Sequence, residues 1–213
     1  GILDERPGKR HAGFIRIASF VLHILFREVF FMRLLKHYTI IGVLFVLVAG
    51  TLAHFLYDWT GRNPVAGLFA PVSESIWEHM KLIFFPMALY SLVMIVRFRG
   101  SFPCIVPSLG FGILIGTLLV PVFYYAYTFV LGRDFFVLDI ADFLLSTLAA
   151  FLLAYRFTLS CRLKGCAPLL WGLVGVLFVC FIVFAYHPPD GAIFAAPGRQ
   201  SSSSAPPKTE RIC

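Results

Sequence analysis

Long apolar runs alternate with short polar segments along most of the chain. A transmembrane helix needs roughly 20 consecutive, mostly apolar residues. Five segments are of about this length: Tyr38–Tyr57, Leu82–Phe98, Phe102–Leu131, Phe135–Phe157 and Ala167–Tyr186. The pattern therefore predicts an all-α fold, a polytopic integral membrane helical bundle with five transmembrane helices.

The stretch before the first span has a different pattern. Apolar residues between Phe14 and Met32 recur at helical spacing, while Arg16, Arg27 and Arg33 fall largely elsewhere on the helical wheel. This is typical of an amphipathic helix that lies in the membrane interface. A spanning helix is the alternative, and it would bury each charge at a cost of about 2.5–3.5 kcal/mol on insertion scales.

We predict three parts along the chain. A basic segment with the amphipathic helix covers residues 1–37, and a five-helix transmembrane domain covers residues 38–194. Residues 195–213 form a Ser/Pro-rich tail, which includes Ser201 to Ser204 and Pro206-Pro207. Such a tail has too little apolar surface to bury and is predicted to be disordered.

Composition supports a membrane protein. Hydrophobic residues make up 59% of the chain and charged residues 14%, with a mean hydropathy of +0.86. Soluble domains contain about 45–50% apolar and about 25% charged residues. The net charge of +7 does not indicate a nucleic-acid partner, because the basic residues lie at the ends of apolar runs and form no patch interleaved with aromatic residues. The predicted partner is the lipid bilayer.

Lys and Arg concentrate on one side of the predicted topology, and loops on the cytoplasmic side are rich in these residues. With five crossings, one side holds Arg6, Lys9, Arg10, Arg16, Arg27, Arg33, Lys36, Arg97, Arg99, Arg156, Arg162 and Lys164. The other side holds only Arg62, Lys81, Arg133 and the basic residues of the tail. We therefore predict a multi-pass protein of the cell membrane with a cytoplasmic N-terminus and an extracytoplasmic C-terminus.

Glycine and cysteine patterns bear on how the helices are held together. Gly112 and Gly116 form a GxxxG motif, which predicts a helix-packing seam. The five cysteines are scattered and show no zinc-type pairing. Cys161 and Cys166 share a basic loop, where metal binding, a disulfide and ordinary free thiols all remain open.

Five crossings bring most of the unusual polar residues to one face of the membrane. The predicted ligand-binding residues are His54, Asp58, Glu74, Glu78, His79, Tyr125, Asp139 and Asp142. His and carboxylate side chains are the usual ligands of divalent metals. The subset predicted to bind metal is His54, Asp58, Glu78, His79 and Asp139. The sequence identifies no cofactor, and a divalent cation is the candidate.

Structural roles compete with ligand binding at these positions. Ser75 and Glu78 fit a capping box, in which the hydroxyl and the carboxylate satisfy free amides at a helix start. Asp139, Asp142 and Ser146 form a polar stripe, which the helix is expected to turn toward protein or trapped water and away from lipid. Their carboxylates then serve either structural hydrogen bonding or a functional site.

Several motifs carry a resemblance to a known family. They are HFLYDW at 54–59, PVSESIWEHMKL at 71–82, PVFYYAYT at 121–128 and YHPP at 186–189. The chain resembles an uncharacterised family of small bacterial multi-pass membrane proteins, one of the domains of unknown function. The family favours Asn where Ser73 stands and an Ile-Pro-Leu-Phe-like run where residues 190–194 read DGAIF. The resemblance implies an integral membrane protein and no established activity.

Three functions fit these patterns. The leading one is a polar, acidic and His-rich pocket on the extracytoplasmic face that binds or transports a cation or small polar ligand. The second is a metal-dependent intramembrane hydrolase acting on lipid, although no H-E-x-x-H or comparable motif is present. The third is a structural or accessory membrane subunit.

Overall fold

In the computed structural model the backbone is described for residues 8–196 and the side chains for residues 26–196. The chain divides into two compact units, Gly1–Tyr38 and Thr39–Cys213. Most of the predicted tail, 197–213, lies outside the described residues, as do the side chains of the predicted amphipathic segment up to Leu25.

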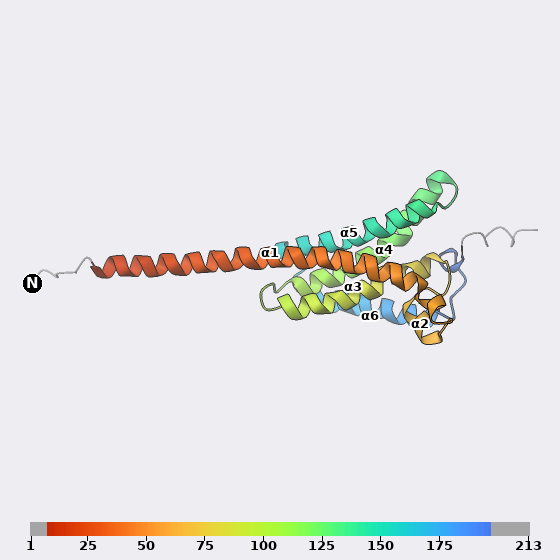
Figure 1. Ribbon diagram of the computed structural model, residues 1–213, viewed down its shortest axis with the longest axis horizontal. Coiled ribbons are helices and arrows are strands. Elements are labelled where there is room, and N and C mark those ends of the chain that lie inside the picture. The colour runs from red at the N-terminus through yellow and green to blue at the C-terminus, as the bar shows by residue number, and fades with distance from the viewer. Residues whose placement is uncertain (1–7, 197–213) are drawn as a thin grey trace, which may run out of the picture. The chain divides into compact units, whose positions relative to one another are not determined.

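The first helix, α1 (Gly8–Trp59), belongs to both units and has no break (Figure 1). The predicted interfacial segment and the first span are therefore parts of one helix. No proline occurs between its ends, and proline is the residue that most strongly stops a helix. From Phe26 to Trp59 the helix is long and apolar enough to cross a membrane.

The second unit contains the rest of α1 and six further elements. They are α2 (Pro64–Phe69), α3 (Ile76–Phe98), α4 (Ile105–Leu131), α5 (Phe136–Ser160), α6 (Ala167–Phe184) and the short 3₁₀ helix η1 (Ala192–Phe194). The described residues form no strand. With α1, the helices α3, α4, α5 and α6 make five candidate membrane spans, which confirms the predicted fold class.

Helix α4 is central to the second unit and packs against α3, α5 and α6. The core between α3 and α4 is apolar, with Ile83, Met87 and Ile113 fully buried. Outward-facing side chains are apolar too, and Val96 and Phe129 are 80% and 90% exposed. Large exposed apolar surfaces are unfavourable in water, and lipid tails are their natural surroundings.

The GxxxG motif lies where α4 meets α5. A Cβ atom at Gly112 would stand 2.8 Å from the carbonyl oxygen of Ala150, and one at Gly116 would stand 2.6 Å from the Cβ of Ala150. Side chains at these positions would push the backbones apart. The predicted helix-packing seam is confirmed, with α5 as the partner helix.

A disulfide joins Cys104, just before α4, to Cys161, just after α5. Their Cα atoms are 5.2 Å apart, although 57 positions separate them in sequence. Cys166 and Cys180 are free. The sequence left the chemistry of Cys161 open, and the antiparallel packing of α4 and α5 selects Cys104 as its partner.

Candidate functional site

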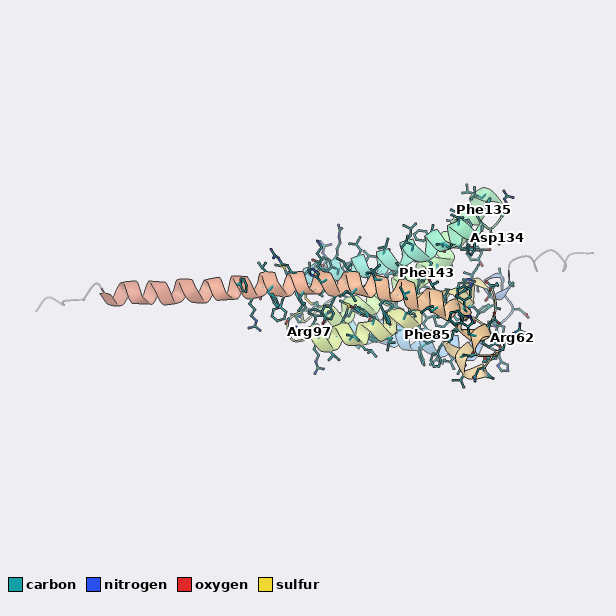
Figure 2. All side chains as sticks on the ribbon, viewed as in Figure 1. Arg62, Phe85, Arg97, Asp134, Phe135 and Phe143 are labelled. Atoms are coloured by element: carbon teal, nitrogen blue, oxygen red, sulfur yellow. A yellow bond between two sulfur atoms is a disulfide. The ribbon has the colours of Figure 1, made fainter. Side chains whose placement is uncertain are left out.

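The second unit has two chemically different ends. The polar end comprises the end of α1, α2, the starts of α3 and α5, the end of α4 and the residues after α6. The basic end comprises the end of α3, the start of α4, the end of α5 and the start of α6. Figure 2 shows Arg62, Asp134 and Phe135 at the polar end and Arg97 at the basic end. All eight predicted site residues belong to the polar end.

Helix α3 begins with a cap that only partly follows the predicted capping box. The Oγ atom of Ser75 accepts a hydrogen bond from the amide of Glu78 at 3.3 Å. A capping box would return the Glu78 carboxylate to the Ser75 amide. Instead the Ser75 amide donates to Oγ of Ser73 at 3.4 Å, and Oε2 of Glu78 accepts from the amide of Val72 at 2.9 Å. The serine half of the prediction is confirmed, and the glutamate half is wrong.

A buried ion pair accounts for the position of Glu78. Nζ of Lys81 lies 2.7 Å from Oε2 of Glu78, and the two side chains are 0% and 4% exposed, respectively. Nζ also donates to the carbonyl oxygen of Gly67 at 3.2 Å. Charges removed from water are tolerated only when they are paired and hydrogen-bonded. Glu78 is therefore held by groups of its own chain.

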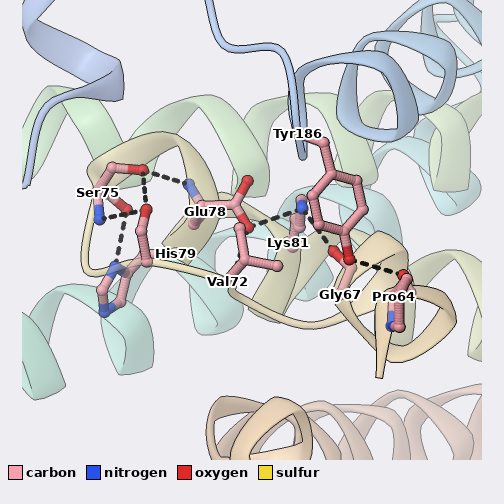
Figure 3. Close-up of polar contacts among 9 residues, drawn as sticks. Pro64, Gly67, Val72, Ser75, Glu78, His79, Lys81 and Tyr186 are labelled. Atoms are coloured by element: carbon pink, nitrogen blue, oxygen red, sulfur yellow. Dashed lines mark hydrogen bonds and ion pairs between the residues drawn. The ribbon is translucent and has the colours of Figure 1, made fainter. Parts of the chain in front are cut away.

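Helix α2 lies between α1 and α3 and contacts this ion pair through the carbonyl oxygen of Gly67 (Figure 3). The side chain of Asn63 caps α2 by accepting from the amide of Val65 at 2.8 Å. The hydroxyl of Tyr186 donates to the carbonyl oxygen of Pro64 at 2.7 Å. A Cβ at Gly67 would collide with the Tyr186 hydroxyl, so only glycine allows this close approach. Partial burial, together with the nearby Tyr57 and Glu78, raises the pKa of Tyr186 above its ordinary value.

One turn along from the cap, His79 is held in a defined tautomer. Its Nδ1 lies 2.9 Å from the carbonyl oxygen of Ser75. A carbonyl oxygen only accepts, so Nδ1 carries a proton and donates it, which leaves Nε2 as the acceptor nitrogen of the neutral ring. Nε2 lies 3.5 Å from Oε2 of Glu74. Two acceptors that face each other attract only when a proton or a metal cation binds between them.

His54 of α1 completes a three-residue cluster with Glu74 and His79. The two imidazole rings lie with their centroids 5.3 Å apart. One potential ligand atom from each of the three residues lies within 4.8 Å of the others. Nδ1 of His54 is buried and has no hydrogen-bond partner among the described residues. Buried polar nitrogens nearly always have a hydrogen-bond or metal partner, so we expect an ion or a water molecule to bind this atom.

The other predicted site residues have partners outside this cluster. Asp58 forms a surface ion pair with Arg62 at 3.6 Å. Oδ1 of Asp139 accepts a hydrogen bond from the hydroxyl of Tyr127. These contacts give both carboxylates structural roles, and their predicted roles in ligand or metal binding remain predictions.

The predicted polar stripe on α5 is turned into the protein. Asp142 and Ser146 are buried, and Oγ of Ser146 donates to Oδ1 of Asp142 at 2.9 Å. The expectation that this stripe faces away from lipid is confirmed for these two residues. Tyr125, by contrast, is exposed and contacts the ring of Tyr124.

The acids of α5 form no hydrogen bond or ion pair with His54 or His79 among the described residues, and the hairpin that carries them projects at the polar end (Figure 1). Figure 2 shows Asp134 and Phe135 at the tip of this hairpin, well separated from Arg62 beside α2. Counting crossings predicts which end a residue occupies and says nothing of this offset.

Some functional contacts had no signal in the sequence. The hydrogen bond from Lys81 to Gly67 bridges 14 positions, and the bond from Tyr186 to Pro64 bridges 122. Only the Glu78–Lys81 spacing of three, which places two helical side chains on one face, pointed to part of this arrangement. Tyr127, not Tyr125, proves to be the tyrosine that contacts an acid.

Comparison with known proteins gives a family but no activity. No curated protein matches the chain, and no solved structure does. A family model matches residues 28–198, which include all five candidate spans apart from Phe26 and Arg27. The resemblance noted from the motifs is confirmed, and the chain belongs to the family of unknown function DUF6512.

Proposed function

We propose that this membrane protein binds a divalent transition-metal ion at its polar end, through His54, Glu74 and His79. The observation that carries the proposal is the hydrogen bond from Nδ1 of His79 to the Ser75 carbonyl. It directs Nε2 toward the carboxylate of Glu74, 3.5 Å away, and leaves that nitrogen as the one through which the ring can bind a metal. Metal-binding histidines commonly donate their second nitrogen to a carbonyl in this way.

The spacing of the cluster suits a zinc-like ion. Bonds of about 2.0–2.1 Å at tetrahedral angles place two ligand atoms about 3.3 Å apart. The Glu74–His79 pair at 3.5 Å is close to this value, and the full cluster, within 4.8 Å, needs to contract modestly. Glu74 is the residue best able to move, since its side chain is 70% exposed.

Binding fits the chain better than transport. A transport path needs polar groups through the whole bilayer. Between Lys81 and Arg97 of α3, and between Asp142 and Arg156 of α5, no Asp, Glu, Lys, Arg or His occurs, and α4 and α6 contain none at all. The ionisable groups are therefore confined to the two ends of the bundle.

A metal-dependent hydrolase is the second candidate, because three protein ligands leave a fourth position for water. Two histidines and one glutamate form the ligand set of several zinc hydrolases. A hydrolase also needs a general base, and Glu78, the acid next to His79 in the sequence, is held by Lys81 and the Val72 amide. Because Glu78 is already bonded in this way, we rank metal binding above hydrolysis.

The site is proposed to face the outside of the cell membrane. The support is the excess of Lys and Arg near the opposite ends of the spans, which marks the cytoplasmic side in most membrane proteins. With five crossings, this proposal has the N-terminus in the cytoplasm and the C-terminus outside.

Titration of the detergent-purified full chain with Zn²⁺, followed by calorimetry, tests the proposal. We expect about one ion per chain, and His54→Ala or His79→Ala should weaken affinity at least about 100-fold, since even second-shell changes cost 10–100-fold. His187→Ala is the matched control, because His187 is exposed and follows α6 at the same end. Equal zinc affinity in His79→Ala and His187→Ala would overturn the proposal and leave protonation as the link between His79 and Glu74.

A further inference from the structure

The basic end of the second unit carries positive charge that has no acidic partner among the described residues. Arg97, Arg99, Arg156, Arg162 and Lys164 lie there, and residues 97–108 and 153–168 contain no Asp or Glu. Neither Arg156 nor Arg162 forms an ion pair with any described residue, and both are exposed. Arg62 at the polar end differs, because Asp58 neutralises it.

A hollow lies beside these two arginines. Its lining consists of Leu153, Arg156, Phe157, Leu159, Ser160 and Arg162, all from the end of α5 and the turn that follows. Leu153, Arg156, Phe157 and Ser160 recur at spacings of three and four, so they share one face of the helix. That face is apolar toward the middle of the bundle and rich in hydrogen-bond donors toward its end.

An apolar surface next to a cationic one on the same helix face matches the chemistry of an amphiphile. Two guanidinium groups and the Ser160 hydroxyl offer donors to a phosphate, which arginine binds in bidentate fashion. Leu153 and Phe157 offer a surface for an acyl chain, and Phe157 is itself held against Phe111 of α4, with ring centroids 5.1 Å apart. A free inorganic anion would use only the polar half of this surface.

The geometry points to a binding site for an anionic phospholipid, and we propose that its phosphate contacts Arg156 and Arg162. Basic residues that lie next to a transmembrane helix attract anionic lipids. The C-terminal end of α5 carries a partial negative charge, which by itself repels an anion. Recognition at this position therefore depends on the two arginines.

The turn after α5 positions the polar part of the site. Cys161 stands between Ser160 and Arg162 in the sequence and is bonded to Cys104 at the start of α4. Its φ of 53° reverses the chain at the end of α5, and its amide donates to the carbonyl of Phe157 at 2.9 Å. Arg162 thus follows a turn that the Cys161 amide closes onto the last turn of α5, which favours a preformed site.

Native mass spectrometry of the full chain in detergent, titrated with dioleoyl phosphatidylglycerol or dioleoyl phosphatidylcholine, tests this inference. We expect the anionic lipid to bind the wild type at least about tenfold more tightly than the zwitterionic one. The double variant R156Q/R162Q should lose about 30-fold in affinity for phosphatidylglycerol, since each basic residue near anionic lipid contributes roughly fivefold. R156K/R162K should keep part of the preference, because the charge is retained while the bidentate contact is lost.

The matched control is Arg133→Gln, which removes one exposed charge from the polar end and should change the affinity less than about threefold. Circular dichroism of each variant checks the helical fold. Equal binding of the two lipids by the wild type, or an unchanged affinity in R156Q/R162Q, would overturn the inference. Displacement of phosphatidylglycerol by an equal concentration of inorganic phosphate would also overturn it, since it would assign the site to free phosphate.

Discussion

The two ends of the five-helix unit differ in how their charges are satisfied. At the polar end, Lys81 is paired with Glu78, Arg62 with Asp58, and His79 lies against Glu74. At the basic end, Arg156 and Arg162 have no acidic partner among the described residues. Of the three Lys and Arg residues described at the polar end, Lys81 and Arg62 therefore have an acidic partner, and Arg133 is exposed.

A similar contrast exists among the acids of the polar end. Glu78 and Asp142 are buried and hydrogen-bonded inside the chain, whereas Glu74 is mostly exposed and faces a histidine. Glu78 already pairs with Lys81 and accepts from the Val72 amide, which leaves it little capacity for a ligand. The exposed, incompletely bonded acid is therefore the better metal ligand.

The largest expected effect comes from breaking the buried pair. Lys81→Met should lower the free energy of unfolding by about 3–5 kcal/mol, because it leaves the Glu78 carboxylate buried and unpaired. The double variant Glu78→Leu with Lys81→Met should recover part of this loss, since two apolar side chains leave no orphan charge. Denaturant unfolding in detergent measures both. A double variant less stable than Lys81→Met would contradict the assignment of a desolvated ion pair.

The disulfide provides the next test, and it concerns the basic end. Reduction, or Cys104→Ser, should lower the free energy of unfolding by about 2–4 kcal/mol, because the bond closes a long loop. Cys166→Ser, which removes a free thiol near the same end, is the control and should have little effect. Thermal unfolding with and without a dithiol reductant gives the comparison.

The same bond tests the proposed orientation. A cytoplasmic basic end is exposed to the reducing thiol pool, so Cys104 and Cys161 should be thiols in the cell and should form the disulfide on oxidation. Acid-quenched cells treated with a thiol-alkylating reagent, followed by mass spectrometry, report the state of each cysteine. A fully oxidised pair in growing cells would place this end outside and reverse the topology.

A smaller effect is expected at Tyr186, which follows α6 outside its candidate span. Tyr186→Phe should cost about 1 kcal/mol, because it removes the hydrogen bond to Pro64. The raised pKa of Tyr186 means that the unfolded chain ionises first, so its contribution is complete below the unfolded pKa and is lost as pH rises through the folded pKa. Unfolding measured from neutral to alkaline pH should show a shallower decline in Tyr186→Phe than in the wild type.

The smallest effect should come from the exposed pair. Asp58→Asn should change the free energy of unfolding by about 0–1 kcal/mol, because both Asp58 and Arg62 are more than three-quarters exposed. Its zinc affinity should stay close to that of the wild type, since Asp58 lies outside the three-residue cluster. Calorimetric titration of Asp58→Asn beside His54→Ala checks this. A large loss of affinity in Asp58→Asn would extend the metal site to a fourth residue.

Much of the fold was predictable because spans depend on local composition. The ends of α3, near Ile76 and Phe98, follow from a capping serine and from the polar residues after Phe98. The GxxxG motif predicted close packing, yet it did not identify α5 as the partner. The disulfide between Cys104 and Cys161 was not predicted either, because pairing depends on which helix ends meet.

The candidate site was predicted less completely. The number of crossings predicts which residues share one end of the bundle. This count correctly predicted that His54 and His79 lie at the same end. Distances within that end depend on how the helices pack, and the pairing of Asp139 with Tyr127 was therefore not predicted. Burial of Lys81 depends on contact with Gly67, a residue 14 positions away.

The sequence by itself determined the class of protein, the five spans, the polar and basic ends and the family. These properties depend on runs of apolar side chains and on the charges at their ends. The reason is that an unpaired polar group in the bilayer core is energetically costly in any fold. Only the tertiary structure decided which acids form hydrogen bonds and ion pairs inside the chain and which face a histidine. The physical reason is that pairing energies act over a few ångströms, and distances on that scale are set by packing between helices that are remote in the sequence.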